Sequence, residues 1–389
     1  MAGAAITGEL TLGGHALTDS GVCFELATSE HDASIRRLLR ENPMPGPIRL
    51  SLEREPSFFA AAALEGPEQQ TIVALEGERV VAAGSISTRQ RFINGQPMQV
   101  GYLGALRLDS SCRGRASILR RGYEAFRRLH SQGGPKIYLT SIMADNLPAR
   151  RFLERGLSGM PTYRFLGEFV TLVIRRADRL EHFRLRSRAR RKLSKQGIKC
   201  MRGSKEQGAE ILDLLRCDHQ KYQFAPVWSA NELHPESIQV ACQADGRPVA
   251  CAALWDQRSI KQIVVRGYSS PLKWARPVLN FGARCLGQPV LPRIGTTLSH
   301  AFVSHVAFSP DQTELAESLI HLLRVRAAAR GIDYVTLGFD SRDPRLKQLR
   351  AALHPREYRS RLYVVHWEDG EALAQNLDDR LLAPEVALL

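Results

Sequence analysis

The order of hydrophobic and polar positions divides the chain into two similar halves of alternating strands and helices. In the first half, short apolar runs predict strands, and apolar residues spaced three and four apart predict helices. The expected strands are Val22–Ala27, Thr71–Leu75, Val80–Thr88, Met98–Leu108, Ile137–Ile142 and Tyr163–Ile174, and the expected helices are Asp32–Arg40, Phe58–Leu64, Ala116–His130 and Leu147–Arg155. This order is typical of a mixed α/β sheet flanked by helices.

The second half repeats the plan. Its expected helices are Ile211–Arg216, Asp311–Arg330 and Arg345–Ala352, and its expected strands are Ile238–Ala244, Val249–Trp255, Ser304–Phe308 and Tyr334–Phe339. Ile137–Pro148 and Asp333–Pro344 both read as an apolar strand, an Asp and a Pro before a helix, which indicates an internal duplication. The Pro- and Gly-containing insert Lys261–Leu298 has no counterpart in the first half, so we expect a lid or a partner-facing loop there.

The length of 389 residues suits two domains. We expect an N-terminal extension, a first domain, a connector, a second domain and a C-terminal tail. Their expected ranges are 1–20, 21–175, 176–205, 206–370 and 371–389.

The net charge of +14 is concentrated in one short segment. Between Arg175 and Lys205 there are 13 Lys and Arg residues against two acidic ones, which gives 13 − 2 = +11. One interpretation is a solvated helical linker. The other is a docking surface at Arg184–Lys192 for an acidic carrier protein, an RNA or a membrane surface.

The cysteines and the hydropathy pattern limit the class of protein. Seven scattered cysteines without a C-x-x-C pair indicate reduced thiols and a cytoplasmic location, and they match no zinc pattern. We therefore expect no metal site. The chain has no apolar run long enough to span a membrane and no basic signal sequence at its start.

The strongest chemical signal is the junction Leu106–Ala116, where a strand runs into a loop and then a helix. Small and basic residues there place backbone N–H groups at a helix N-terminus, which suits a pyrophosphate. Arg113 and Arg115 add charge, and Gly114 lets the backbone approach closely. The alternative interpretation is a turn with two solvated arginines.

Together with a second motif, this junction resembles a known family. Arg113-Gly114-Arg115 after a strand, followed by Asn-x-x-Ala-x-x-Phe-Leu-x-x-Gly from Asn146 to Gly156, is similar to motifs A and B of the GNAT acyl-CoA-dependent N-acyltransferases. The resemblance covers Val22–Ile174, and the second half looks like a degenerate copy. It implies an α/β fold of two tandem GNAT-like mixed sheets with flanking helices.

The resemblance also implies roles for individual residues. The backbone of Leu106 and Leu108 would bind the pantetheine arm of the acyl-CoA. The loop Arg113, Gly114, Arg115 and Ala116, together with Ser117, would hold the pyrophosphate, and Asn146 would face the CoA arm.

The sequence departs from the family at two places. The family pattern in this loop is Gln or Arg, two residues, Gly, one residue, and then Gly or Ala. If the pattern starts at Arg113, Ala116 replaces the Gly and Ile118 replaces the last small residue. If it starts at Ser111, Gly114 and Ala116 fit, but the leading basic residue is missing. Leu153 stands where many members have a general-acid Tyr. Thiolate departure is fairly easy without an acid, because a thiol pKa lies near ~8.5.

The attacking amine still needs a base, because a lysine-like amine titrates near ~10.4. The candidates are Tyr102, Asp109, Asp145 and Tyr163.

These features predict direct transfer of an acyl group, most simply acetyl, from acyl-CoA to an amine on a small molecule or a protein. A catalytically silent acyl-CoA-binding or scaffold protein is one alternative, and an acyl or aminoacyl transferase served by a carrier protein or tRNA is another. We expect no CoA site in the second half, because Asp311 and Glu314 at its helix start would repel a pyrophosphate. His300 and His305 are expected to be structural, since their spacing on a strand puts them on opposite faces.

Overall fold

The structure is a computed structural model and describes residues 21–389 apart from 63, 113, 157, 179–192, 195–196, 286–288 and 309–311. Within that part of the chain, the strands form one sheet of 12 strands and a separate two-stranded ribbon. The order across the large sheet is β1 (Val22–Leu26), β3 (Glu68–Glu76), β4 (Arg79–Ile93), β5 (Gln96–Leu108), β6 (Ile137–Met143), β14 (Arg356–His366), β7 (Thr162–Arg175), β13 (Tyr334–Asp340), β12 (His300–Ala307), β10 (Pro248–Trp255), β9 (Ile238–Cys242) and β8 (Lys199–Arg202). The ribbon pairs β2 (Ile48–Glu53) with β11 (Gln262–Tyr268).

Helices cover both faces of the sheet, because neighbouring strand residues point to opposite sides. Val73 and Val80 pack under α1 and α2, whereas the next residues along the chain, Ala74 and Val81, pack in the cluster that contains Ile118 of α3. The helices are α1 (Asp32–Glu41), α2 (Phe58–Ala62), α3 (Ala116–His130), α4 (Leu147–Leu153), α6 (Gly208–His219), α7 (Ser270–Cys285), α8 (Thr313–Ala329), α9 (Arg345–Leu353) and α10 (Glu371–Gln375).

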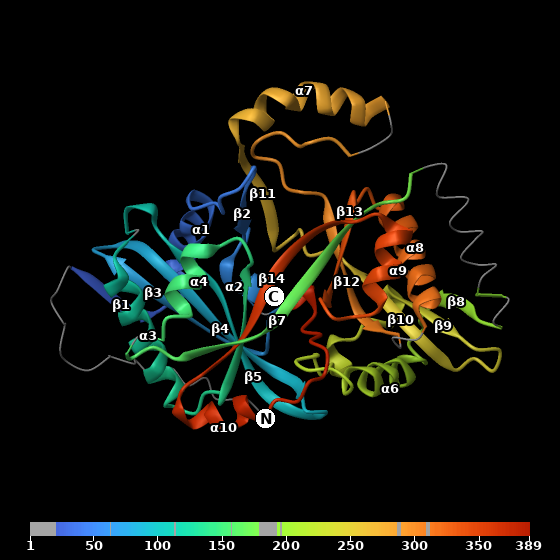
Figure 1. The fold of residues 1–389 in the computed structure, drawn as a ribbon, viewed down its shortest axis with the longest axis horizontal. Coiled ribbons are helices and arrows are strands. Elements are labelled where there is room, and N and C mark those ends of the chain that lie inside the picture. The colour runs from blue at the N-terminus through green and yellow to red at the C-terminus, as the bar shows by residue number, and fades with distance from the viewer. Residues whose placement is uncertain are drawn as a thin grey trace.

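The two sequence halves exchange one strand each. β14, near the end of the chain, lies between β6 and β7 and is antiparallel to both. β7, which ends the first half, lies in turn between β14 and β13. Figure 1 shows β7 and β14 running side by side across the centre of the molecule. Each half-sheet is therefore completed by a strand from the other half.

The hydrophobic core confirms that this exchange is built into the packing. Val170, Leu172 and Ile174 of β7 are buried in the cluster that lies under α8 and α9 of the second half. Conversely, Tyr363 and Val365 of β14 are buried in the cluster formed with α3 and α4 of the first half. The two halves thus share their cores.

The residues after β14 return to the middle of the molecule. Ala387 and Leu388 are buried, and the side-chain amide of Gln257 donates a 3.2 Å hydrogen bond to the carbonyl oxygen of Ala387. Gln223 bonds through its backbone to both Leu381 and Ala383. The range 371–389, expected as a tail, is therefore packed against both halves, and the domain boundaries expected from sequence remain predictions.

Both halves contain the same local feature, a strand with a β-bulge beyond which its pairing with the parallel neighbouring strand ends. β5 pairs with β6 only at Gly101 and Tyr102, and β12 pairs with β13 only from His300 to Phe302. Just beyond these points the register slips, and Ala105 and His305 take left-handed backbone angles of φ 50° and 51°. A bulge re-aims a strand, so each half has a V-shaped gap in its backbone pairing.

Candidate active site

The gap between β5 and β6 lies where the sequence places the pantetheine arm. Beyond Tyr102, β5 is paired only with β4 on its other side, and the hydroxyl of Thr140 on β6 donates a 2.8 Å bond to the carbonyl oxygen of Leu103. Leu106 is 45% exposed, whereas Leu108 packs partly into the core next to α3. The backbone from Gly104 to Leu108 is therefore free of β pairing along this edge, as an extended ligand requires.

The loop after β5 leads directly to the N-terminus of α3. A single turn, Ser110–Cys112, precedes Gly114, which has φ 86° and nothing within 4 Å of an added Cβ. Ala116 and Ser117 then begin α3 and are exposed. Such a helix N-terminus carries partial positive charge, which favours an anion. Gly114, Ala116 and Ser117 lie together there, and their binding of a pyrophosphate stays a prediction.

The structure describes only one of the two arginines of this loop, Arg115. Arg113 lies outside the described residues. The Arg115 guanidinium pairs with Glu76 at 3.1 Å and lies 3.6 Å from the Cys112 sulfur. It therefore braces the loop against the end of β3, and a bound phosphate would compete with Glu76 for it.

Asp109 stabilises the same loop. Its carboxylate accepts bonds from the backbone N–H and the hydroxyl of Ser111, at 2.9 and 2.7 Å, and from Arg79 at 2.8 Å. Although burial opposes it, these hydrogen bonds hold the pKa of Asp109 below its usual range. A carboxylate committed to three donors is a poor base, so Asp109 acts as a structural brace.

Tyr163 is also occupied structurally. The Tyr163 hydroxyl lies 2.5 Å from the hydroxyl of Tyr123 on α3. Burial, and to a smaller extent the neighbouring Tyr123, raises the pKa of Tyr163 well above the usual value. Asp145 is exposed, and Asn146 caps α4 by accepting a 3.4 Å bond from the backbone of Ala149. The roles of Tyr163 and Asp145 as bases stay predictions.

Tyr102 is the candidate that lies at the vertex. It is the last residue of β5 paired with β6, and its ring packs beneath Gly104, where an added Cβ would come within 2.8 Å of the ring. Burial raises its pKa, and the nearby Glu65 adds to this effect. The phenol therefore stays protonated at neutral pH, and the role of base that the sequence analysis gives to Tyr102 stays a prediction.

A group of buried charges on the same face of β4 and β5 was not expected from the sequence. Arg54 and Lys261 flank the Glu65 carboxylate at 2.5 and 2.9 Å. Although burial alone would raise it, these two cations keep the pKa of Glu65 below its usual range. Since Lys261 comes from the second half, this wall beside Tyr102 is made by both halves.

Arg91 is fully buried in the same region. Its guanidinium donates to the carbonyl oxygens of Phe224 and Pro384 at 2.9 and 3.0 Å. Burial, together with the neighbouring Arg89, lowers its pKa to about 9. The only sequence signal was the polar alternation of Ser85, Ser87, Arg89 and Arg91 along β4, which resembles an ordinary solvated strand face.

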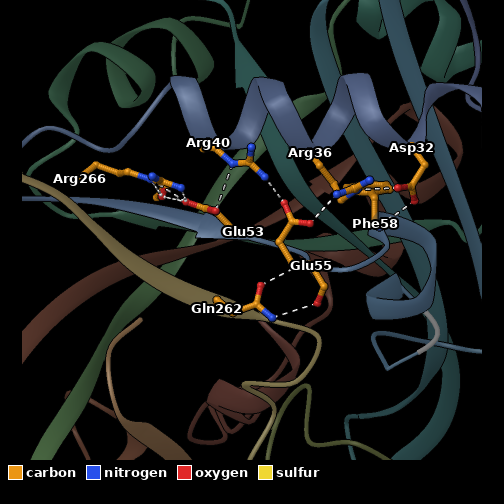
Figure 2. Close-up of polar contacts among 9 residues, drawn as sticks. Asp32, Arg36, Arg40, Glu53, Glu55, Phe58, Gln262 and Arg266 are labelled. Atoms are coloured by element: carbon orange, nitrogen blue, oxygen red, sulfur yellow. Dashed lines mark hydrogen bonds and ion pairs between the residues drawn. The ribbon is translucent and has the colours of Figure 1, made fainter. Parts of the chain in front are cut away.

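A second group of charges fastens the first half to the ribbon strand β11, as Figure 2 shows. Gln262 exchanges two hydrogen bonds with the backbone of Glu55, at 2.9 and 3.0 Å. Arg266 binds Glu53 at 2.8 Å, and Arg36 and Arg40 of α1 pair with Glu55. The base of the insert 261–298 is thus fixed to α1 and β2.

The corresponding gap in the second half is closed by the chain itself. The Glu385 carboxylate accepts bonds from the backbone N–H of His305, at 2.6 Å, and from the Ser304 hydroxyl, at 2.8 Å. The His219 ring lies 3.0 Å from the carbonyl oxygen of Val306. The polar backbone groups at this bulge are therefore engaged before any ligand arrives.

The two histidines of β12 make structural contacts. The His305 ring stacks on Trp228 at 3.9 Å between centroids, and burial lowers its pKa to about 3. The His300 ring lies 3.2 Å from the Leu298 carbonyl oxygen. Within the described part of the chain, no group of His, Cys, Asp and Glu side chains could hold a metal ion.

Comparisons with known proteins bear on both the first half and the whole fold. Residues 33–158 match the model of the acetyltransferase (GNAT) family. No match was found among curated protein sequences.

Solved structures match over most of the chain. N-myristoyltransferase from Saccharomyces cerevisiae with bound myristoyl-CoA has a TM-score of 0.55 at 12% identity, covering 88% of this chain and 82% of that one. A GCN5-related N-acetyltransferase from Sphaerobacter thermophilus has a TM-score of 0.52 at 13% identity, covering 89% and 96%. A GCN5-related glucosamine N-acetyltransferase region of a fungal multi-domain protein has a TM-score of 0.54 at 12% identity, covering 90% and 39%. These matches confirm the expected tandem mixed α/β fold.

Proposed function

We propose that this chain is an acyl-CoA N-acyltransferase of the GNAT type, because residues 33–158 match the model of that family. In this proposal it transfers an acetyl group from acetyl-CoA to an amine, using only the gap of the first half. The observation that carries the proposal is the pairing of two features: the unpaired edge of β5 beyond Tyr102, and the exposed N-terminus of α3 at Ala116. They provide a slot for a pantetheine arm and, at its outer end, a position for a pyrophosphate. As a further part of the proposal, the seven cysteines, all free, favour the cytoplasm.

In the proposed reaction the amine attacks the thioester carbon directly. Backbone N–H groups at the Ala105 bulge stabilise the oxyanion. The amine attacks as its neutral free base, after its ammonium form has lost a proton to solvent. The C–N bond forms, the C–S bond breaks, and the proton that the amine then releases passes through the Tyr102 hydroxyl to the leaving thiolate, so that no free phenolate forms. No cysteine or serine at this gap is needed as an intermediate acyl carrier, so a ternary complex suffices.

Acetyl-CoA is expected to bind with a stoichiometry of one per chain. The first gap is open along β5, whereas Glu385 occupies the backbone donor of the second gap. Isothermal titration calorimetry with acetyl-CoA measures this directly. A stoichiometry near two would show that the second gap also binds, and no heat at millimolar acetyl-CoA would remove the proposal.

Tyr102→Phe is expected to lower kcat for CoA release by about 10- to 100-fold, because it removes the proton donor at the vertex. Binding of acetyl-CoA should be unchanged. The matched control is Tyr163→Phe, which removes a hydroxyl that is already paired with that of Tyr123 and should leave kcat within a factor of two to three. CoA release is followed with a panel of amines.

The same assay separates the enzyme from a silent acyl-CoA-binding protein. Leu153 favours the silent alternative, because it is buried and has no hydroxyl where many GNAT members have a Tyr. Stoichiometric binding of acetyl-CoA without CoA release for any amine would support that alternative. Equal activity of the two Tyr variants would instead reject Tyr102 as the donor and leave the binding site intact.

A further inference from the structure

Helix α7 (Ser270–Cys285) turns its polar side inward and its apolar side outward. Asn280 is buried, and its side-chain amide exchanges two hydrogen bonds with the backbone of Leu291, at 3.0 and 2.7 Å. Trp274, Val278 and Phe281 are 83, 76 and 69% exposed. These three residues follow the spacing of one helix face, so the stripe that a water-soluble helix normally buries is the one in contact with solvent.

The apolar surface extends beyond this stripe. Leu279 on the same helix is 49% exposed, and Ile294, on the segment that returns beneath the helix, is 56% exposed. Figure 1 shows α7 at the outer end of the molecule, away from the large sheet. Trp274, Val278, Leu279 and Phe281 are thus four large apolar side chains exposed on one helix, and such a surface is typically covered by another apolar phase.

The charge around the patch has one sign. The insert 261–298 contains six Lys and Arg residues and no Asp or Glu. Lys261 and Arg266 at its base are paired with Glu65 and Glu53. Lys273 and Arg284 on α7 and Arg293 on the segment that follows it are exposed, and the insert offers them no acidic partner.

We propose that α7 lies in the headgroup layer of an anionic lipid bilayer. Trp274, Val278 and Phe281 enter the boundary of the acyl chains, while Lys273, Arg284 and Arg293 meet lipid phosphates. Exposed Trp and Phe on one side of a helix with only basic charge around it are typical of interfacial helices. Among the described residues, no helix has the length and apolar character to cross a membrane, so α7 would lie along the surface.

The attachment of the helix supports a surface anchor. Arg276 packs over the Tyr268 ring at 5.5 Å, and the Tyr268 hydroxyl donates a 2.7 Å bond to the Pro292 carbonyl oxygen. Below them, β11 is fixed to β2 and α1 by the contacts drawn in Figure 2. An apolar face held at a fixed position on the body can meet a flat surface without rearrangement.

The test is co-sedimentation of the full chain with phosphatidylcholine vesicles, with and without phosphatidylglycerol. We expect binding to the anionic vesicles that is at least ten-fold stronger than binding to the neutral ones. The triple variant Trp274→Ser, Val278→Ser, Phe281→Ser should lose at least ten-fold of the binding. Its control, Met201→Ser with Phe165→Ser, removes apolar side chains that are 45 and 43% exposed outside the insert and should bind like the wild type.

A second variant tests the charge separately. Lys273→Gln, Arg284→Gln, Arg293→Gln should remove the preference for phosphatidylglycerol and reduce the dependence of binding on salt. Equal, weak sedimentation with both vesicle types would overturn the proposal. So would a dimer in size-exclusion chromatography that the triple Ser variant dissociates, because α7 would then be an interface between two copies of the chain.

Discussion

A chain that ends after Leu353 is expected to be insoluble or to unfold without a cooperative transition. The truncation removes β14, which pairs with β6 from Ile137 to Met143 and with β7 from Thr162 to Val173. It exposes two long strand edges in the middle of the sheet and opens the cores that Tyr363 and Val365 fill. Unpaired apolar edges of this kind aggregate. Circular dichroism during thermal unfolding and the soluble fraction measure the effect.

A complementary design makes this prediction specific to the strand exchange. Residues 21–178 expressed alone should fail in the same way, although they contain the whole segment with the family motifs. Co-expression of 21–178 with 193–389 should restore a soluble complex, because the second fragment supplies β14 and the first supplies β7. A monomeric 21–178 fragment that unfolds cooperatively would show that the exchanged strand is dispensable.

Gly114→Asp is expected to weaken acetyl-CoA binding by at least ten-fold. An added Cβ meets open space, but φ 86° is a conformation that residues other than Gly rarely adopt, so some loss of stability is expected and the control has to share it. Its carboxylate would lie at the N-terminus of α3, where the proposed pyrophosphate accepts N–H bonds, and would repel it. Titration calorimetry gives the dissociation constant, and the melting temperature reports the stability.

The matched control is Gly133→Asp, just beyond the other end of the same helix. Gly133 also has a positive φ, 108°, and nothing within 4 Å of an added Cβ. The substitution has the same charge and the same type of strain but lies beyond the C-terminal end of α3, at the opposite end of the helix from the proposed pyrophosphate. It should leave acetyl-CoA binding unchanged. Equal loss of affinity in both variants would mean that net charge, and not the pyrophosphate position, controls binding.

The sequence predicts the elements that depend on local signals. The hairpins of β3–β4 and β4–β5 form where Glu76-Gly77 and Asn94-Gly95 occur, and Asn94 and Gly95 both take positive φ as that turn requires. The motif junction, with its strand, loop and helix, also forms as expected. Local propensity and turn chemistry suffice for these features.

The elements that sequence analysis missed depend on distant partners. β14 begins with the polar run Arg356–Ser360, and its burial follows only from its position between β6 and β7. α7 contains Pro277, and its apolar face points outward. The sequence of this segment therefore resembles that of a loop. The strands with which β14 and β7 could pair have similar apolar sequences, so a single sequence does not reveal which pairing forms.

The site shows the same division. The loop residues Gly114 to Ser117 lie together because they are contiguous, and Asn146 follows β6 as the motif implies. The raised pKa of Tyr102 depends on burial, and the hydrogen bonding of Asp109 depends on the donors around it, neither of which the sequence shows. The buried Arg91 depends on carbonyl oxygens more than a hundred residues away.

The position of β14 also has a consequence for synthesis on the ribosome. The first half has no complete sheet until residues 356–366 have left the exit tunnel, about 190 residues after β7. Until then its nascent β6 edge is open. Chaperone occupancy on the growing chain should therefore persist over that interval, and the first half should fold only after β14 has emerged.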